Sequence, residues 1–117
     1  MSERIVLVGA GNMATAIACS LKESGKAPVA VWSRTAESAQ MLADRVGTEW
    51  HCDIDSLPQA DVVIISIVDS ALREIAAKVS AKFPDALILH TAGSIHMDTL
   101  RECGAKKYGV LYPMQTV

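Results

Sequence analysis

Apolar residues in this chain fall into short continuous runs, and these runs alternate with longer stretches of helical period. The run from Asp61 to Val68 is almost entirely β-branched and apolar, which is typical of a strand buried on both faces of a parallel sheet. The pattern predicts six strands, in chain order at residues 5–8, 28–32, 49–52, 61–68, 86–90 and 108–112. The third is brief and a turn-rich segment follows it, so we expect it at a sheet edge.

The residues between these runs repeat with the period of an α-helix. After the first run, Met13, Ile17 and Leu21 recur at four-residue spacing, which gives one apolar stripe. In the next helix we expect Thr35 to be the N-cap and Gly47 to be the stop signal. The core-facing positions of that helix are predicted to be Ala39, Leu42, Ala43 and Val46. Two further helices are predicted, from residue 70 to about 83 and from 96 to 103.

Strands that alternate with helices over 117 residues describe an α/β fold with a doubly wound, mostly parallel sheet. With right-handed crossovers the expected strand order is 3-2-1-4-5-6, which is the Rossmann arrangement. The order reverses between the first and fourth strands, so a ligand crevice is expected at their carboxyl ends. Residues 9–13 are predicted on one side of this crevice, and Val68 and Asp69 on the other.

A glycine motif follows the first strand directly. The pattern G-x-G-x-x-A is formed by Gly9, Ala10, Gly11, Asn12, Met13 and Ala14. Gly9 permits a tight turn, Gly11 removes the side chain that would block a pyrophosphate, and the new helix offers free N–H groups. The flanking strand and helix, with a second strand about 20 residues on, supply the context that a dinucleotide site requires. The alternative is an ordinary strand-to-helix turn that uses two glycines.

The residues after the second strand bear on the choice of dinucleotide. NAD-dependent enzymes usually place a carboxylate there for the ribose 2′-hydroxyl, whereas this chain has Ser33, Arg34 and Thr35. Two hydroxyls and a guanidinium suit a 2′-phosphate, because arginine pairs its planar donors with phosphate oxygens. The sequence therefore favours NADP. In the alternative interpretation Arg34 is a solvated surface residue and Thr35 is only a helix cap.

Composition and charge argue against several other classes of protein. The chain has 11 basic and 13 acidic residues, so we expect no binding to nucleic acid. Its cysteines, Cys19, Cys52 and Cys103, are widely spaced and are expected to be packing residues, so neither a metal site nor a disulfide framework is predicted. The chain opens without a leader pattern and has no apolar run near the roughly 20 residues of a bilayer span, so we expect a cytoplasmic protein.

The first two thirds of the chain resemble the amino-terminal half of pyrroline-5-carboxylate reductase. The resembling residues are the glycine motif at 9–14, Ala16, Leu21, Ser24-Gly25, Arg34-Thr35 and residues 60–64. The Asn12-Met13 pair is fairly specific to that branch of the 6-phosphogluconate-dehydrogenase-like superfamily, which also contains deazaflavin-dependent NADP oxidoreductases. The resemblance implies a helical domain after the cofactor domain, one that completes the substrate site and the dimer. A small-molecule substrate and a homo-oligomer are therefore expected.

The resemblance weakens where substrate chemistry begins. The reductases carry a Lys-Pro pair after the fourth strand and a Met-Pro-Asn-Thr-Pro run after the sixth, where this chain has Val68-Asp69 and residues 112–116, Tyr-Pro-Met-Gln-Thr. Proline synthesis is therefore not implied. Residues 90–94 and 113–116 more closely resemble a group of Rossmann-like oxidoreductases of unassigned substrate, whose chains are longer. We expect a carboxyl-terminal domain that is absent from these 117 residues.

His90, at the end of the fifth strand, is the candidate catalytic residue, because an imidazole there could donate a proton as hydride arrives. The alternative is a half-buried histidine bonded to backbone. Asp69 is expected either to accept a ribose hydroxyl or to cap the following helix. These features predict the NADP-binding half of an oxidoreductase that acts on a small imine, carbonyl or hydroxy acid, inactive by itself. The alternative is an NADP-sensing module without catalysis.

Overall fold

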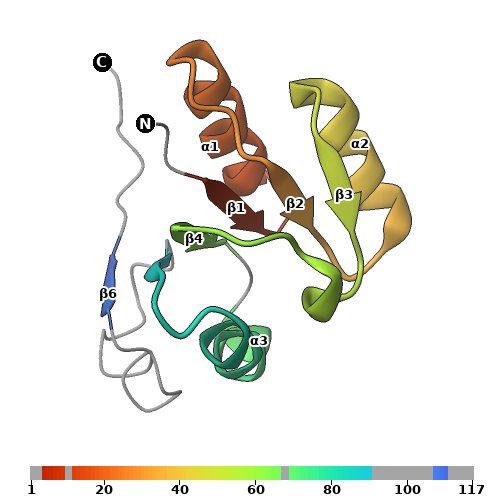
Figure 1. Ribbon diagram of the computed structural model, residues 1–117. Helices are drawn as coiled ribbons and strands as arrows, with labels where there is room; N and C mark the ends of the chain where they lie inside the picture. Colours follow the sequence, from red (N-terminus) through yellow and green to blue (C-terminus); the bar gives the residue numbers. More distant parts are fainter. Residues whose placement is uncertain (1–3, 10–11, 67–68, 91–106, 111–117) are drawn as a thin grey trace.

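The computed structural model describes residues 4–9, 12–66, 69–90 and 107–110, with the backbone alone at 12, 13, 69–73 and 107–110 (Figure 1). Its strands are β1 (Ile5–Val8), β2 (Ala30–Trp32), β3 (Glu49–His51), β4 (Val62–Ile65), β5 (Leu87–His90) and β6 (Lys107–Val110). Its helices are α1 (Asn12–Glu23), α2 (Ala36–Val46), α3 (Asp69–Lys82) and the short 3-10 helix η1 (Ile54–Ser56). No helix in these ranges has the length and apolar character needed to cross a membrane.

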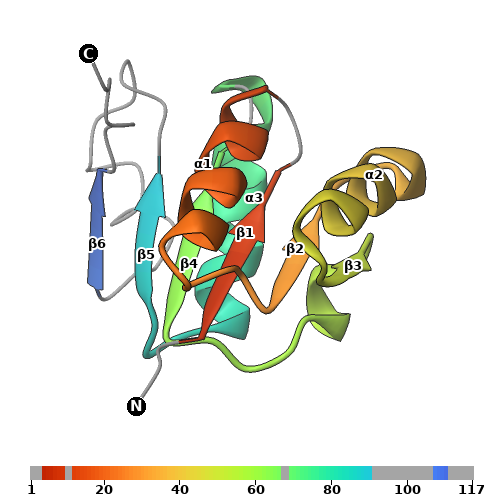
Figure 2. The same ribbon diagram turned by 90° about the horizontal axis from the view of Figure 1, so that it is seen from above.

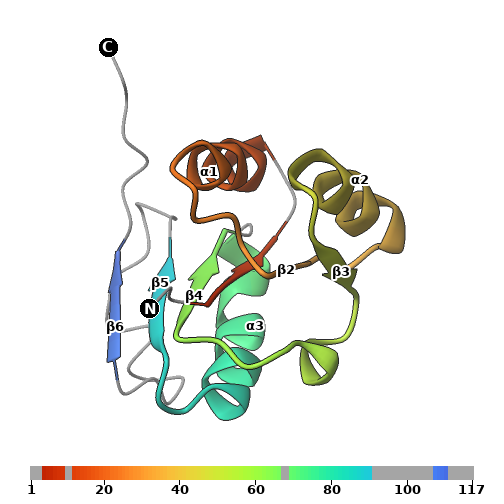
Figure 3. The same cartoon turned by 45° about the horizontal axis from the view of Figure 1, so that its top comes forward.

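The strands form one sheet in the order β3-β2-β1-β4-β5-β6, and each neighbouring pair is parallel. The predicted α/β class and the strand order 3-2-1-4-5-6 are therefore confirmed, and β3 lies at an edge as expected. Helices α1 and α2 cover one face of the sheet and α3 covers the other (Figures 2 and 3). This arrangement leaves the carboxyl ends of β1, β2 and β4 side by side.

Two strands are shorter than their apolar runs predict. The run at 28–32 gives β2, which begins two residues later than predicted. The run at 61–68 gives β4, whose last ladder pair joins Ile65 to Val8, the final residue of β1; residues 67 and 68 lie outside the described residues. Ser66 follows β4, and its backbone N–H still donates to the Val8 carbonyl at 2.8 Å. The predicted helix at 96–103, and residues 111 and 112 of the predicted last strand, lie outside the described residues.

The core has two layers, one on each face of the sheet. Val6 and Val8 of β1 pack in the layer beneath α3, whereas Ile5 and Leu7 pack beneath α1 and α2. All four residues of β1 are buried, so this strand is apolar on both faces, as a central parallel strand requires. Full burial of each such side chain contributes about 1.5 to 3 kcal/mol to stability. The first strand therefore holds the position of the turn that follows it.

Helix α2 begins and ends at the residues that the sequence predicts. Thr35 is the N-cap, and its side chain accepts a hydrogen bond from the Ser38 backbone N–H at 3.4 Å. Gly47 is the C-cap in the left-handed region, at a φ of 73°, and its N–H donates to the Ala43 carbonyl. The predicted core-facing residues are all buried, namely Ala39, Leu42, Ala43 and Val46. The loop from β2 into α2 is thus held at one end by β2, which ends at Trp32, and at the other by the N-cap Thr35.

Candidate functional site

Backbone hydrogen bonds align the carboxyl ends of the central strands. The Gly9 N–H, directly after β1, donates to the Trp32 carbonyl of β2 at 2.7 Å. The Ser33 N–H, directly after β2, donates to the His51 carbonyl of β3 at 3.1 Å. These two bonds place the glycine turn beside the residues that follow β2, at the edge of the sheet where the strand order reverses.

Gly9, the first residue after β1, has a backbone conformation that suits a glycine. Gly9 is buried and has a φ of 126°, in a region that L side chains rarely adopt. Helix α1 begins at Asn12, so a strand, a glycine turn and a helix N-terminus follow one another within a few residues. The predicted residues Ala10 and Gly11 lie outside the described residues, and Asn12 and Met13 are described as backbone only.

The residues after β2 present the groups predicted for a 2′-phosphate. Ser33 is half-buried and Arg34 is exposed. The Arg34 guanidinium has no hydrogen bond or ion pair with any residue that the structure describes, so its donors are available. Thr35 caps α2, which agrees with both interpretations of this residue. None of residues 33–35 carries a carboxylate.

The opposite side of the predicted crevice is described only in part. Val68 lies outside the described residues, and Asp69 is the first residue of α3 with its side chain undescribed. The proposed roles of Asp69 as a ribose ligand or a helix cap therefore both stay open. The start of α3 at the carboxyl end of β4 is nevertheless the position from which a helix N-terminus faces the crevice.

His90 is more deeply buried than the half-buried histidine of the alternative interpretation. It ends β5 on the same face as Ile88, the face covered by α3, and it is completely buried. Neither ring nitrogen has a hydrogen-bond partner among the described residues, and the ring is fully rather than half buried. Burial lowers the pKa of His90 below its ordinary value of 6.5, because the charged form loses hydration. At neutral pH the ring is uncharged and offers one donor and one acceptor.

This burial predicts a pH-dependent loss of stability. The unfolded chain takes up a proton at His90 before the folded chain does, so the free energy of unfolding should fall as the pH falls below about 6.5. His90→Leu should remove the contribution of His90 to the pH dependence of the free energy of unfolding. At pH 8 the variant should be as stable as the original chain or more stable, because an apolar group replaces unpaired nitrogens. Urea unfolding of both proteins from pH 8 to 5 measures the difference. A loss of several kcal/mol in the variant at pH 8 would show that the ring has polar partners after all.

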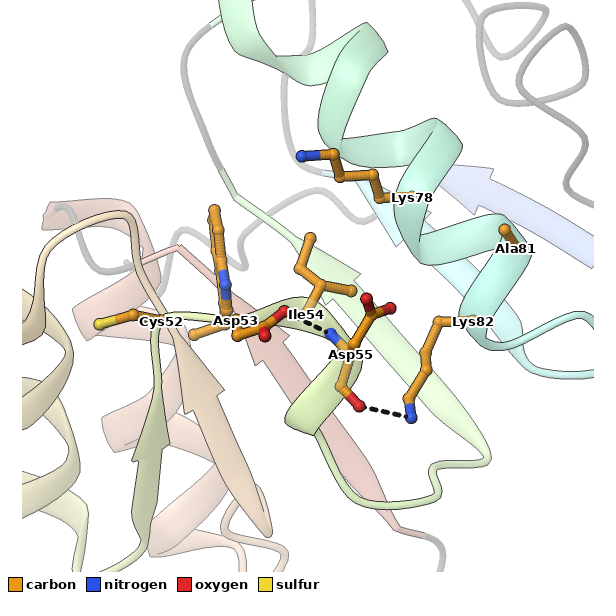
Figure 4. Close-up of a pocket in the computed structure, with 8 residues that line it drawn as sticks. Cys52, Asp53, Ile54, Asp55, Lys78, Ala81 and Lys82 are labelled. Atoms are coloured by element: carbon orange, nitrogen blue, oxygen red, sulfur yellow. Dashed lines mark hydrogen bonds between the residues drawn. The ribbon is translucent and has the colours of Figure 1, made fainter.

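A pocket of about 590 Å³ lies on the α3 face of the sheet, and the sequence gives no sign of it (Figure 4). Its walls come from the end of β2, from residues 52–55 and from residues 78–82 of α3. Three segments this far apart in the chain share no motif and no period, so only the fold brings them together. Cys52 lines the pocket and is exposed, so the expectation that it is a packing residue is wrong. Cys19 is half-buried.

Comparison with known proteins identifies the kind of domain. A family model described as shikimate / quinate 5-dehydrogenase matches residues 1–84. A glutamyl-tRNA reductase of Saccharolobus solfataricus is 39% identical over 71 residues, which are 60% of this chain but 17% of that protein. The chain therefore matches less than a fifth of the length of this relative.

Three solved structures share the fold. A provisionally assigned NADP oxidoreductase of Bacteroides fragilis is 44% identical, with a TM-score of 0.88, and the match covers 98% of this chain and 45% of the other. A prephenate dehydrogenase of A. aeolicus, solved with hydroxyphenyl propionate and NAD+, is 25% identical, with a TM-score of 0.80 and coverages of 93% and 41%. A pyrroline-5-carboxylate reductase of Coxiella burnetii is 19% identical, with a TM-score of 0.79 and coverages of 91% and 41%, which shows the fold alone.

The resemblance to the pyrroline-5-carboxylate reductase branch is confirmed as a shared amino-terminal Rossmann domain. The chain spans less than half of each of these structures. Because the family model covers most of the chain and Gly9 follows β1 with a positive φ, the protein belongs to the shikimate / quinate 5-dehydrogenase family as an NAD(P)-binding Rossmann domain.

Proposed function

We propose that this chain is the NADP(H)-binding domain of an oxidoreductase that transfers hydride to or from a small imine, carbonyl or hydroxy acid. One observation carries the proposal. The unpaired, exposed Arg34 stands between Ser33 and the capping Thr35, and the Gly9 turn is bonded to the residue that precedes them. A pyrophosphate at the turn would therefore extend its adenosine toward these donors.

The described residues fit an NADP molecule. The positive φ of Gly9 supports the close approach of a pyrophosphate, and the N-terminus of α1 supplies N–H groups to it. Arg34 and the hydroxyls of Ser33 and Thr35 are donors suited to a 2′-phosphate. The Bacteroides fragilis protein is described as an NADP oxidoreductase, which supports this choice, whereas the prephenate dehydrogenase was solved with NAD+.

The chemistry divides between the cofactor and the chain. NADP supplies the hydride when bound, and the chain's own residues bind and orient it. In our proposal His90 acts from the carboxyl end of β5, the strand next to β4, although its ring is buried on the α3 face in this structure. The ring would have to be uncovered before its N–H could hydrogen-bond a substrate carbonyl or imine nitrogen. Donation of a proton after the hydride would require the imidazolium form, which the transfer returns to neutral imidazole.

The proposal is tested by the choice of cofactor. NADPH should bind the chain at least about tenfold more tightly than NADH, the usual worth of a hydrogen bond to a charged phosphate. Isothermal titration calorimetry at fixed low salt measures both constants. Equal affinities, or tighter binding of NADH, would contradict the assignment of Ser33, Arg34 and Thr35 to a 2′-phosphate.

We also expect no hydride transfer by the 117 residues alone. The structures that match this chain are more than twice its length, and we propose that a second, helical domain completes the substrate site and forms a homo-oligomer. Half of the pocket would then be missing here. NADPH should keep its absorbance at 340 nm, the ordinary signal of the reduced cofactor, on incubation with imines, ketones and 2-hydroxy acids. Steady substrate-dependent oxidation would show that the catalytic site lies within this domain.

A further inference from the structure

The pocket on the α3 face has two walls of opposite charge. Asp53 and Asp55 belong to the wall formed by the segment after β3, and Lys78 and Lys82 belong to the wall formed by α3 (Figure 4). Trp32, Ile54 and Ala81 are the apolar residues of the lining. The cavity of about 590 Å³ is within the range of pockets that hold small metabolites.

The charged groups of the pocket are only partly committed to one another. One oxygen of the Asp53 carboxylate accepts from the Asp55 backbone N–H at 3.0 Å, and the Asp55 carboxylate has no partner in the described structure. Lys78 pairs with Glu74 at 3.6 Å, an exposed helix-surface pair of little energetic worth. Lys82 donates to the Asp55 carbonyl at 2.9 Å, which ties the two walls together at one end. The wall with Asp53 and Asp55 can therefore bind a cationic group, and the wall with Lys78 and Lys82 can bind an anionic group.

Trp32 adds an unsatisfied donor to the same pocket. Its side chain is 5% exposed and lines the cavity, and its indole N–H is buried without a hydrogen-bond partner in the described residues. A buried donor without a partner destabilises the fold, because it has lost its hydrogen bond to water and gained none in the protein. Since the ring forms part of the wall, a ligand that shifts it slightly can supply the missing acceptor.

We propose that this pocket binds a free α-amino acid with an uncharged side chain. The ammonium group faces the carboxylates of Asp53 and Asp55, and the carboxylate faces Lys78 and reaches toward the indole N–H of Trp32. The apolar side chain rests on the surface between the walls, near Ile54. A zwitterion fits this arrangement better than a simple anion or cation, because each of those would leave one charged wall without a partner.

The proposal is independent of the dinucleotide site. None of the residues predicted to bind NADP lines this pocket, although Trp32 directly precedes Ser33 in the chain. The amino-acid site can therefore exist whether or not the chain prefers NADP. Competition with NADPH distinguishes a separate pocket from an extension of the cofactor crevice.

The test compares one amino acid with its two charge-deleted analogues on the cofactor-free chain. L-leucine carries both charges, 4-methylpentanoate only the carboxylate, and 3-methylbutylamine only the ammonium. Saturation-transfer NMR at about 10 mM detects even weak ligands, and calorimetry gives the dissociation constants. L-leucine, L-glutamine or L-phenylalanine should bind, and for leucine each analogue should bind about tenfold more weakly.

Two variants assign the charges to the walls. Asp55→Asn should weaken L-leucine and 3-methylbutylamine about three- to tenfold and leave 4-methylpentanoate unchanged. Lys78→Gln should weaken L-leucine and 4-methylpentanoate and leave the amine unchanged. Both side chains are exposed, so folding should be preserved. The matched controls are Asp44→Asn and Lys26→Gln, which replace exposed residues outside the pocket and should change nothing.

Three results would overturn the proposal. The first is that none of the three amino acids binds at about 10 mM, where a ligand with a dissociation constant of about 1 mM would occupy most of the protein. The second is binding that neither Asp55→Asn nor Lys78→Gln weakens, since the charged walls would then play no part. The third is displacement of L-leucine by NADPH in strict competition, which would make the pocket part of the cofactor site.

Discussion

Gly11→Val is expected to abolish NADP(H) binding without lowering the melting temperature of the cofactor-free chain. Residue 11 is the second glycine of the motif, where a side chain would project toward the pyrophosphate. The core residues of β1 precede this position in the chain and are not replaced by the change. Calorimetric titration with NADPH and a thermal melt of the free protein measure the two effects separately.

Gly9→Val is the matched comparison, because Gly9 is buried with a φ of 126° and a branched residue there is strained in the fold itself. We expect it to cost about 1 to 3 kcal/mol of stability as well as cofactor binding. The contrast between the two variants separates a glycine needed for the ligand from a glycine needed for the backbone. If Gly11→Val also unfolds the free protein, the motif serves the turn, and the functional interpretation loses its main support.

The sheet could be predicted from the sequence because its signals are local. A run of β-branched residues such as 61–68 needs burial on both faces, and helical period between such runs requires parallel strands with crossovers. Helix ends were also predictable, since Thr35 and Gly47 act through their own backbone neighbours. Strand starts were less predictable, because β2 begins at Ala30, which pairs with Val6 of β1, and β4 begins at Val62, which pairs with Ile5, and a register is a property of two segments.

The positions of candidate site residues could be predicted where they depend on nearby sequence, and could not where they depend on packing between distant segments. Gly9 and Arg34 stand at fixed distances from strand ends, so the fingerprint in the amino-acid sequence is enough to place both residues. The surroundings of His90 depend on how α3 covers β5, which no pattern near residue 90 encodes. The pocket beside Trp32 likewise depends on the packing of residues 52–55 against α3, and its charges look like ordinary surface residues in the sequence.

Arg34→Ala is expected to weaken NADPH binding by about 1.5 to 3 kcal/mol, or roughly 10- to 150-fold, and to leave NADH binding nearly unchanged. The guanidinium is exposed and unpaired in the described structure, so its removal breaks no contact of the fold. Only the cofactor with a 2′-phosphate should therefore lose a partner. The loss should shrink as salt is raised, because the interaction is between charges at the surface.

Arg45→Ala is the control for Arg34→Ala, since Arg45 is an exposed arginine in the last turn of α2, at the opposite end of that helix from Thr35. It should leave the affinities for both cofactors unchanged. Calorimetry with NADPH and NADH at two salt concentrations gives four constants for each variant. An equal loss for NADPH and NADH in Arg34→Ala would mean that the guanidinium contacts a part common to both, such as the adenine or the pyrophosphate. The preference for NADP would then need another source, and Ser33 and Thr35 are the donors that remain beside it.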